Sequence, residues 1–127
     1  MKFDWHLYYE LAQKLFDDSE TNKTLSDAFL RSSISRAYFA SHCLVRDYLL
    51  NSRQITPPRK KEKIHQWVIQ QIRQDPDVSN LSVTLSRLRN DRINADYNGK
   101  KRNFKRMAEG ALIGAKIIID ALDQVSV

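Results

Sequence analysis

The chain has 127 residues, and 21 Lys and Arg against 15 Asp and Glu give it a formal net charge of +6. This length fits a single domain, residues 1–127, and a hydrophobic content of 42% excludes wholesale disorder. The single cysteine excludes an internal disulfide. No apolar run approaches the roughly 20 residues of a membrane span, and the first residues lack the apolar stretch of a signal peptide. We therefore expect a cytoplasmic protein with no membrane contact.

Five amphipathic helices are expected, because apolar residues recur at helical spacing and no segment alternates with the period of a strand. The first covers residues 4–17. The second is long, follows the pattern Thr24–Asp27, which resembles a capping box, and ends before the proline-containing break at 51–58. The third covers about 60–73.

The fourth helix starts near an N-cap at Asp77 or Ser79 and ends at Asn98–Gly99, and the last covers about 101–124. With only three glycines and three prolines, the chain has few breaks between these helices. Helices joined by short connections predict an all-α, up-and-down bundle of about five helices.

The positive charge is concentrated in two stretches of the chain. Residues 53–65 hold five basic residues against one acidic residue, and residues 86–106 hold eight against two. Such patches favour polyanions such as RNA, because neutralising phosphates releases counterions. The alternative is that surface helices simply carry Lys and Arg.

Several common chemistries find no support in the sequence. The three histidines stand on three different predicted helices: His6, His42 and His65. None has a ligand at metal-binding spacing, so we expect no metal and no cofactor. Gly110 and Gly114 fall inside a predicted helix, where they favour the close approach of a neighbouring helix over phosphate binding. Cys43 has no base in helical register, which favours a small core residue over a nucleophile.

The fourth predicted helix carries an unusual group of polar residues. Arg92 occupies a position that the preceding leucines predict to be buried, and a buried guanidinium needs a partner. Asp96 lies four residues on and is the expected partner, Arg89 shares the same face, and Tyr97 adds a ring that can pack or stack. Two interpretations remain: a structural salt bridge closed by a tyrosine, or a cleft that faces an anion or RNA.

Three short motifs, in matching order, resemble the HEPN-domain family. Residues 35–44 (Ser-Arg-Ala-Tyr-Phe-Ala-Ser-His-Cys-Leu) resemble the signature of its second helix. Residues 63–69 (Lys-Ile-His-Gln-Trp-Val-Ile) are similar to a segment of its third helix, and 92–97 (Arg-Ile-Asn-Ala-Asp-Tyr) to an element of a small, single-domain branch. The resemblance spans roughly residues 4–122. It implies a helical bundle that dimerises, often with the fourth-helix motifs of both subunits at a shared cleft.

The resemblance also implies a range of activities. Many members are metal-independent ribonucleases of toxin–antitoxin and antiviral systems, or act beside a small nucleotidyltransferase. Their catalytic element is an arginine followed by a polar residue, with a histidine a few residues later. Arg89 and Asn90 match its first half, but no histidine follows His65.

The position of the missing histidine is held, depending on register, by Asn94, Ala95 or Asp96. Asn and Ala cannot transfer protons, and an Asp paired with arginine stays ionised and is a poor general acid near neutrality. His65 can replace the missing group only if the third helix reaches the cleft. The catalytic candidates are therefore Arg89, His65 and Tyr97.

We expect this HEPN-like domain to bind RNA or a nucleotide-bearing partner. The expected contact residues are Arg89, Asn90, Arg92, Asp96, Tyr97, Lys100, Lys101 and Arg102. One alternative is a ribonuclease with a non-standard catalytic set, and another is a protein-interaction module, either an antitoxin or the partner of a nucleotidyltransferase. A homodimer is expected from the resemblance and from the small-residue face of the last helix.

Overall fold

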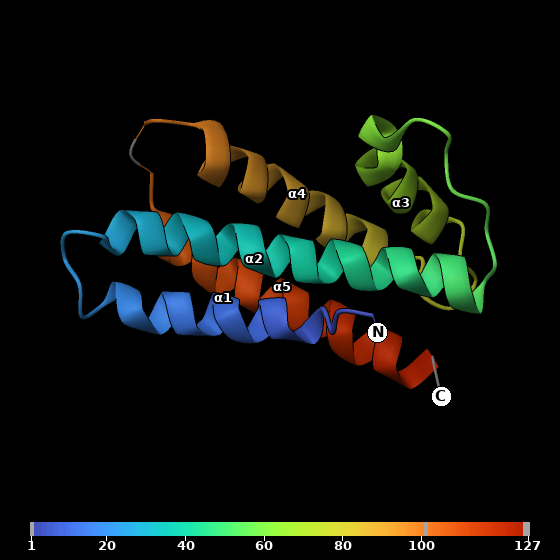
Figure 1. Ribbon diagram of the computed structural model, residues 1–127, viewed down its shortest axis with the longest axis horizontal. Coiled ribbons are helices and arrows are strands. Elements are labelled where there is room, and N and C mark those ends of the chain that lie inside the picture. The colour runs from blue at the N-terminus through green and yellow to red at the C-terminus, as the bar shows by residue number, and fades with distance from the viewer. Residues whose placement is uncertain (1, 101, 126–127) are drawn as a thin grey trace.

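The computed structural model describes residues 2–100 and 102–125, and its regular structure is helical. Its five α-helices are α1 (His6–Ser19), α2 (Ser26–Asp47), α3 (Ile64–Arg73), α4 (Leu81–Tyr97) and α5 (Phe104–Val125) (Figure 1). A π-helical turn (Tyr48–Ser52) continues α2, and a short 3-10 helix (Lys61–Lys63) leads into α3. The prediction of an all-α bundle of about five helices is confirmed.

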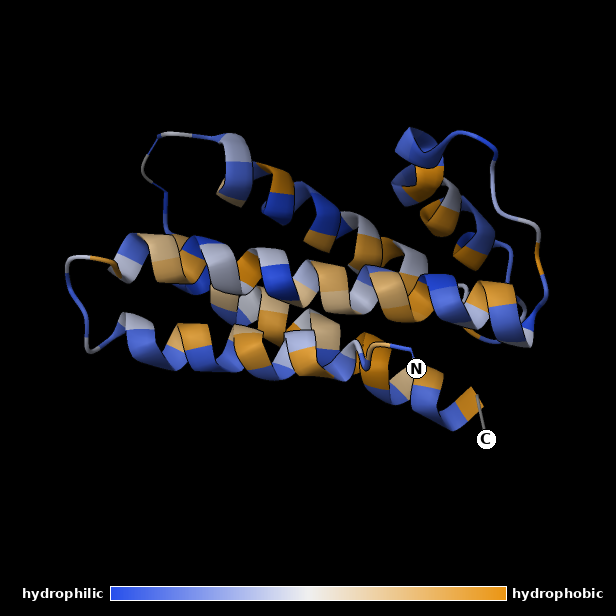
Figure 2. Cartoon of the chain, viewed as in Figure 1, coloured by the Kyte–Doolittle hydropathy of each residue, from blue (hydrophilic) through white to orange (hydrophobic). Residues whose placement is uncertain are grey.

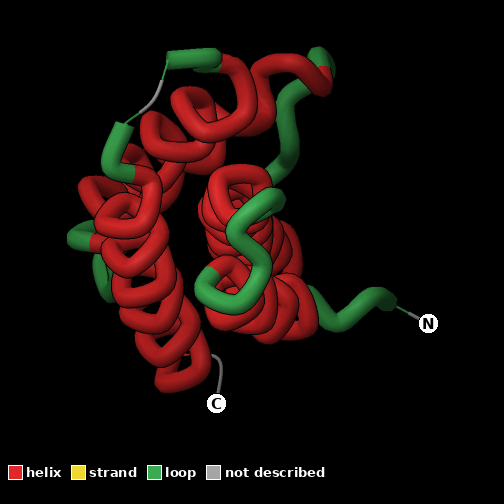
Figure 3. Tube along the Cα trace, turned by 90° about the vertical axis from the view of Figure 1, so that its left-hand side faces the viewer, coloured by secondary structure: helices red, strands yellow, loops and turns green. Residues whose placement is uncertain are grey.

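Helix α2 lies at the centre of the bundle and contacts each of the other four α-helices. The long helices α1, α2, α4 and α5 run alternately in opposite directions, and the shorter α3 packs near the end of α2 (Figure 1). Figure 3 shows the bundle from its end, with loops connecting the helices. Within the described residues, none of the helices combines the length and apolar character needed to cross a membrane.

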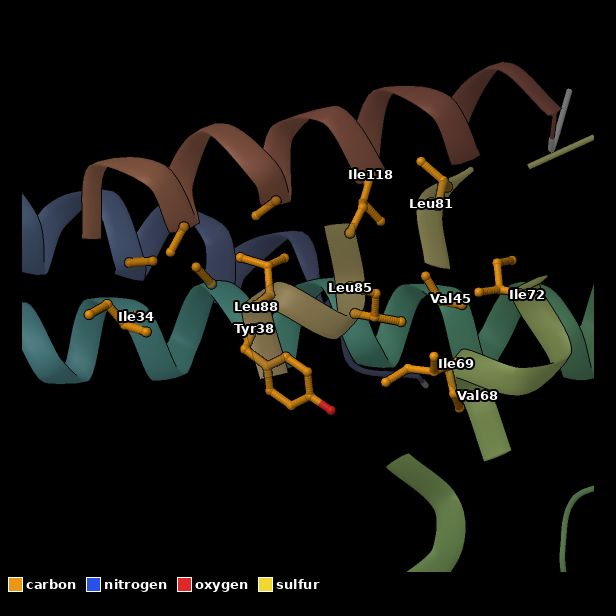
Figure 4. Packing of buried hydrophobic residues seen from close by; sticks show 14 of the residues in the cluster. Ile34, Tyr38, Val45, Val68, Ile69, Ile72, Leu81, Leu85, Leu88 and Ile118 are labelled. Atoms are coloured by element: carbon orange, nitrogen blue, oxygen red, sulfur yellow. The ribbon is translucent and has the colours of Figure 1, made fainter. Parts of the chain in front are cut away.

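The helices pack because each presents an apolar stripe to a shared interior. Figure 2 shows this pattern along the helices, and also the strongly hydrophilic C-terminal half of α4. Buried side chains from four helices meet in the core, among them Ile34, Val45, Ile72, Leu85 and Ile118 (Figure 4). The core fixes where α4 lies against α2, and thereby which polar side chains the two helices bring together.

The start of α2 differs from the predicted capping box. Leu25 occupies the N-cap position and makes no side-chain capping bond. The Asn22 side chain instead accepts a hydrogen bond from the Leu25 amide at 3.1 Å, and Asp27 pairs with Arg31 at 2.7 Å. The Asn22 side chain thus satisfies an amide at the start of the helix, one different from the Asp27 amide expected for Thr24.

Arg31 joins the first half of α2 to the C-terminal end of α4. Its guanidinium donates to the carbonyl oxygens of Ala95 at 3.2 Å, Asn98 at 2.6 Å and Lys100 at 3.4 Å, and it lies over the Phe104 ring at 4.2 Å. The last carbonyls of a helix have no partner inside the helix, so a cation is well placed there. We call this contact the Arg31 clamp.

A second polar connection lies at the other end of α4 and is called the Asp75 junction. The Asp75 carboxylate is almost fully buried and accepts hydrogen bonds from the Tyr48 hydroxyl and from Arg53, both at 2.9 Å. Its other oxygen accepts from the backbone amides of Asp77 and Val78, and Arg53 also pairs with Asp77. The junction orders the turn between α3 and α4.

Helices α4 and α5 approach each other closely at Gly114. A Cβ atom at this position would lie 3.1 Å from an Arg87 nitrogen and 3.2 Å from a Thr84 methyl group. Ala111 and Ala115 are also buried in the core. At Ala111, Gly114 and Ala115 the small-residue face of the last helix therefore serves packing within the chain, whereas a Cβ at Gly110 would meet no atom within 4 Å. The support of this face for a homodimer is reduced to that extent.

Candidate nucleic-acid interface

The predicted ion pair on α4 is present. Arg92 Nε donates to Asp96 Oδ2 at 2.9 Å, and their side chains are 18% and 27% exposed. The same Asp96 oxygen accepts a hydrogen bond from the Ser35 hydroxyl of α2 at 3.3 Å. Arg92 is therefore neither unpaired nor sealed in the core, because the position on the leucine stripe opens toward the surface at this end of α4.

The Arg92 guanidinium lies on aromatic rings. Its central carbon is 4.8 Å from the centroid of the Phe39 ring, 5.6 Å from that of Tyr97 and 5.9 Å from that of Tyr38. The guanidinium of Arg36, one turn before Phe39 on α2, also lies over the Phe39 ring, at 5.2 Å. Cation–π contacts hold both guanidinium groups in place and leave N–H groups for other partners.

His65 of α3 reaches the same place. Its Nδ1 is 2.5 Å from the Tyr38 hydroxyl, and its ring stacks on His42 at a centroid separation of 4.2 Å. The start of α3 therefore lies beside the α2 residue Tyr38, over which the Arg92 guanidinium also lies, and the charges of Arg92 and Arg89 act on the His65 ring. A catalytic role for His65 stays a prediction.

We call Arg36, Tyr38, Phe39, His65, Arg89 and Arg92 the arginine–aromatic cluster. Among the described residues, neither Arg36 nor Arg89 forms an ion pair with a carboxylate. Arg92, which pairs with Asp96, is therefore the one arginine of the cluster whose charge is neutralised within the described residues. Three guanidinium groups against one carboxylate leave an excess of positive charge at this surface. Such a surface attracts anions.

Burial and positive charge together keep the rings of this region uncharged at neutral pH. Burial lowers the pKa of His65, and the charges of Arg92 and Arg89 lower it further. Burial, followed by repulsion from His65 and the nearby arginines, lowers the pKa of His42 to about 3. Burial raises the pKa of the Tyr38 hydroxyl although Arg89 and Arg92 oppose this shift. The positive charge of the cluster thus comes from its arginines.

The remaining predicted contact residues do not all join the cluster. Tyr97 is 74% exposed and borders it through Arg92. Asn90 is exposed on α4, and its carbonyl accepts a hydrogen bond from the Asn94 side chain. Lys100 and Arg102 lie exposed in the loop between α4 and α5, next to the Arg31 clamp, and Lys101 lies outside the described residues.

Two other sequence predictions concern metals and thiols. In the described part of the chain, no group of three or more His, Cys, Asp or Glu side chains is arranged to hold a metal ion. Cys43 is buried, as expected of a core residue, and burial raises the pKa of its thiol. A raised pKa disfavours the nucleophilic thiolate at neutral pH.

Sequence reasoning missed the contribution of α2. Arg36, Tyr38 and Phe39 stand inside the motif at residues 35–44 but received no functional role. The signal available in the sequence was Arg36 close to the two aromatic residues Tyr38 and Phe39, in a helix that otherwise buries serines and alanines around them. Their relation to Arg92 depends on tertiary packing, which no local pattern reports.

Comparisons with protein-family models, curated proteins and solved structures found no match to the chain. The family resemblance therefore rests on the three short motifs, and the functional argument rests on the geometry of the arginine–aromatic cluster.

Proposed function

We propose that the protein binds RNA through the arginine–aromatic cluster. The observation that carries this proposal is that Arg36 and Arg92, from two helices, lie over the half-buried Phe39 ring beside the exposed Tyr97 ring. The charge of Arg89 acts on the neighbouring Tyr38 and His65, and Asp96 is the carboxylate that pairs with Arg92. Guanidinium groups donate in a fork that matches phosphate oxygens, and aromatic rings stack on bases. Each ingredient of single-strand recognition is thus present at one surface.

In this proposal Arg36, Arg89 and Arg92 hold phosphates. Asp96 orients Arg92 by accepting from Nε, which leaves its terminal nitrogens for a ligand. The Phe39 ring fixes the guanidinium planes of Arg36 and Arg92 before RNA arrives. Ordering these side chains in advance reduces the entropy lost on binding.

The test measures affinity for a fluorescent single-stranded RNA as a function of salt concentration. We expect Arg89→Ala/Arg92→Ala to weaken binding and to reduce the slope of log K against log salt by about 0.7 per lost phosphate contact. Arg73→Ala is the control, because Arg73 is exposed at the end of α3, away from the cluster. An unchanged slope in the double variant would contradict the proposal.

A ribonuclease is the second candidate, favoured by the position of His65. When Nδ1–H donates to the Tyr38 oxygen, Nε2 carries the lone pair that accepts the 2′-hydroxyl proton of RNA. The 2′-oxygen then attacks the adjacent phosphorus, the bond to the 5′-oxygen breaks, and that oxygen takes a proton from water. Arg89 and Arg92 would stabilise the charge that develops on the phosphoryl oxygens.

Cleavage is tested by incubating mixed RNA with the protein in EDTA and analysing the ends formed. Products with 2′,3′-cyclic phosphate and 5′-hydroxyl ends, lost in His65→Ala or Tyr97→Phe, would support the ribonuclease. Intact RNA together with salt-dependent binding would leave RNA binding alone. Co-purification of a small partner protein without RNA affinity would favour the interaction module, such as an antitoxin or the partner of a nucleotidyltransferase.

We further propose a HEPN-like fold and a homodimer, which the three sequence motifs support. The single, buried cysteine supports a location in the reducing cytoplasm. A role in a toxin–antitoxin or antiviral system follows from the same resemblance. Light scattering at several protein concentrations tests the dimer, and a monomer at all concentrations would remove it from the proposal.

A further inference from the structure

A pocket of about 400 Å³ opens beside the arginine–aromatic cluster, between the start of α1, the middle of α2 and the start of α3. Its walls include the rings of Trp5, Tyr8, Phe39 and His65 and the side chains of Arg36 and Arg46. The volume lies within the range of roughly 300–1,000 Å³ that is typical of small-molecule sites. None of the residues assigned to the fourth-helix motif lines it.

The pocket combines flat apolar walls with positive charge. The Arg36 guanidinium lies 4.8 Å from the centroid of the Tyr8 ring, and the Arg46 guanidinium lies 5.5 Å from that of Trp5. No Asp or Glu lines the pocket, and Arg46 pairs with its sequence neighbour Asp47 at 3.1 Å. Such a site suits a ligand with a planar ring and a negative charge.

His42 supplies an independent observation. It lies in the pocket wall, it is 3% exposed, and its Nδ1 has no hydrogen-bond partner. Within the described residues it is the one buried side-chain nitrogen or oxygen atom without a partner. A buried polar atom without a partner costs stability, and such atoms gather at sites that serve a ligand.

We infer that this pocket receives the base of an unpaired nucleotide, whose phosphates lie on Arg36 and Arg46. This inference rests on the proposed RNA binding, because Arg36, Phe39 and His65 belong to both the pocket and the cluster. A strand held by Arg92 continues to Arg36 and turns one base into the pocket. A base inside a duplex is stacked on both faces and cannot enter, so the protein selects single strands.

Trp5 provides a direct readout of the pocket. The chain has two tryptophans, and Trp67→Phe leaves Trp5 as the single reporter. We expect adenosine 5′-monophosphate and single-stranded oligo(A) to quench Trp5 fluorescence by stacking, and ribose 5-phosphate and an RNA duplex to leave it unchanged.

Two variants locate the ligand. Arg46→Gln should raise the dissociation constant for adenosine 5′-monophosphate about tenfold, through loss of a charge-assisted contact. Arg73→Gln removes the same charge from an exposed position outside the pocket and should leave that constant unchanged. Equal effects of the two variants would overturn the assignment of the phosphate to Arg46.

The outcomes separate this inference from the proposed function. RNA binding that depends on Arg89 and Arg92, with no Trp5 response to any nucleotide, overturns the pocket and leaves the proposed function standing. A Trp5 response to adenosine 5′-monophosphate without RNA binding supports a free-nucleotide site and overturns RNA binding. Quenching by a glutamate-rich peptide and not by nucleotides overturns the inference in favour of a protein ligand.

Discussion

Two of the arginine–carboxylate contacts in the protein, Arg53–Asp75 and Arg92–Asp96, use the same chemistry in different ways. In the Asp75 junction the carboxylate is 2% exposed, and both of its oxygens accept several hydrogen bonds from the surrounding chain. In the arginine–aromatic cluster Asp96 is 27% exposed and holds Arg92 by one bond, while the rest of the guanidinium lies on rings. The first contact is complete within the chain. The second leaves donors for a ligand, and this difference separates a structural ion pair from a binding site.

The largest expected difference between the two contacts is in stability. Asp75→Ala should lower the free energy of unfolding by about 4 kcal/mol, because it removes several buried hydrogen bonds at once. Asp96→Ala should cost less than about 1 kcal/mol, as is usual for partly exposed pairs. Urea unfolding measures both, with exposed Asp17→Ala as the control. Equal losses would show that the Arg92–Asp96 pair is structural too.

His42, which stacks on His65 of the cluster, and the Asp75 junction should affect stability over different pH ranges. The low pKa of His42 means that the unfolded chain binds a proton near pH 6.5 while the folded chain does not, so stability falls as pH drops below 6.5 toward about 3. The share of His42 in the loss between pH 7 and pH 4 should be about 3 kcal/mol, and His42→Phe should remove that share and leave the smaller one of His65, whose pKa is also lowered. His6→Gln, at a half-exposed position, is the control.

The Asp75 junction acts at lower pH. Burial opposes ionisation of Asp75, but hydrogen bonds from Asp77, Arg53 and Tyr48 outweigh it and hold the pKa below its usual value. Its contribution is therefore complete above about pH 4, the unfolded value, and is lost as pH falls through the lower folded pKa. A His42→Phe protein that loses as much stability between pH 7 and pH 5 as the unaltered protein would contradict the assignment of that range to His42.

Replacing Arg53 and Arg89 separately by glutamine should distinguish a residue needed for folding from one needed for binding. Arg53→Gln should lower the urea midpoint and leave the RNA affinity of the folded protein unchanged. Arg89→Gln should leave the midpoint unchanged and weaken RNA binding about tenfold, because Arg89 has no ion pair within the described residues. If Arg53→Gln weakens binding as much as Arg89→Gln at a temperature where both are folded, the proposed interface is misplaced.

The smallest expected effect tests the competition between Asp96 and phosphate. Asp96→Asn removes a negative charge and keeps a side-chain oxygen that accepts from Arg92 Nε, so RNA affinity should rise about twofold, while stability falls by about 0.5 kcal/mol. Titration of RNA at constant salt measures the first and urea unfolding the second. A fall in affinity would show that Asp96 is needed to orient Arg92 and outweighs the charge it adds.

Helical periodicity was sufficient to predict the five helices, because each has a long apolar stripe whose spacing is visible in sequence. It also predicted the Arg92–Asp96 pair, since residues four apart share a helix face. It did not predict the end of α2, where Arg53 and Tyr48 join Asp75 across more than 20 residues. The capping box at Thr24–Asp27 was wrong because Leu25 occupies the N-cap position, where its side chain cannot accept a hydrogen bond, and because the Asp27 carboxylate pairs with Arg31.

The cluster was only half predicted for the same physical reason. Arg92 stood out because it interrupts a stripe of leucines, and Arg89 because it shares a helix face with Arg92. Arg36 and Phe39 did not, since their importance comes from the angle at which α2 passes α4. The stacking of His42 on His65 was likewise beyond any local pattern, because the two lie on different helices separated by a proline-containing segment.

The Arg31 clamp and the Asp75 junction fix α4 against the rest of the bundle at its two ends. The exposed positions between these ends can therefore be changed by mutation with little effect on the backbone, whereas the buried leucines of α4 cannot. The surface positions that face Phe39 and Tyr97 are then suitable for a small library of variants. Such a library could be screened for altered ligand preference on an unchanged scaffold.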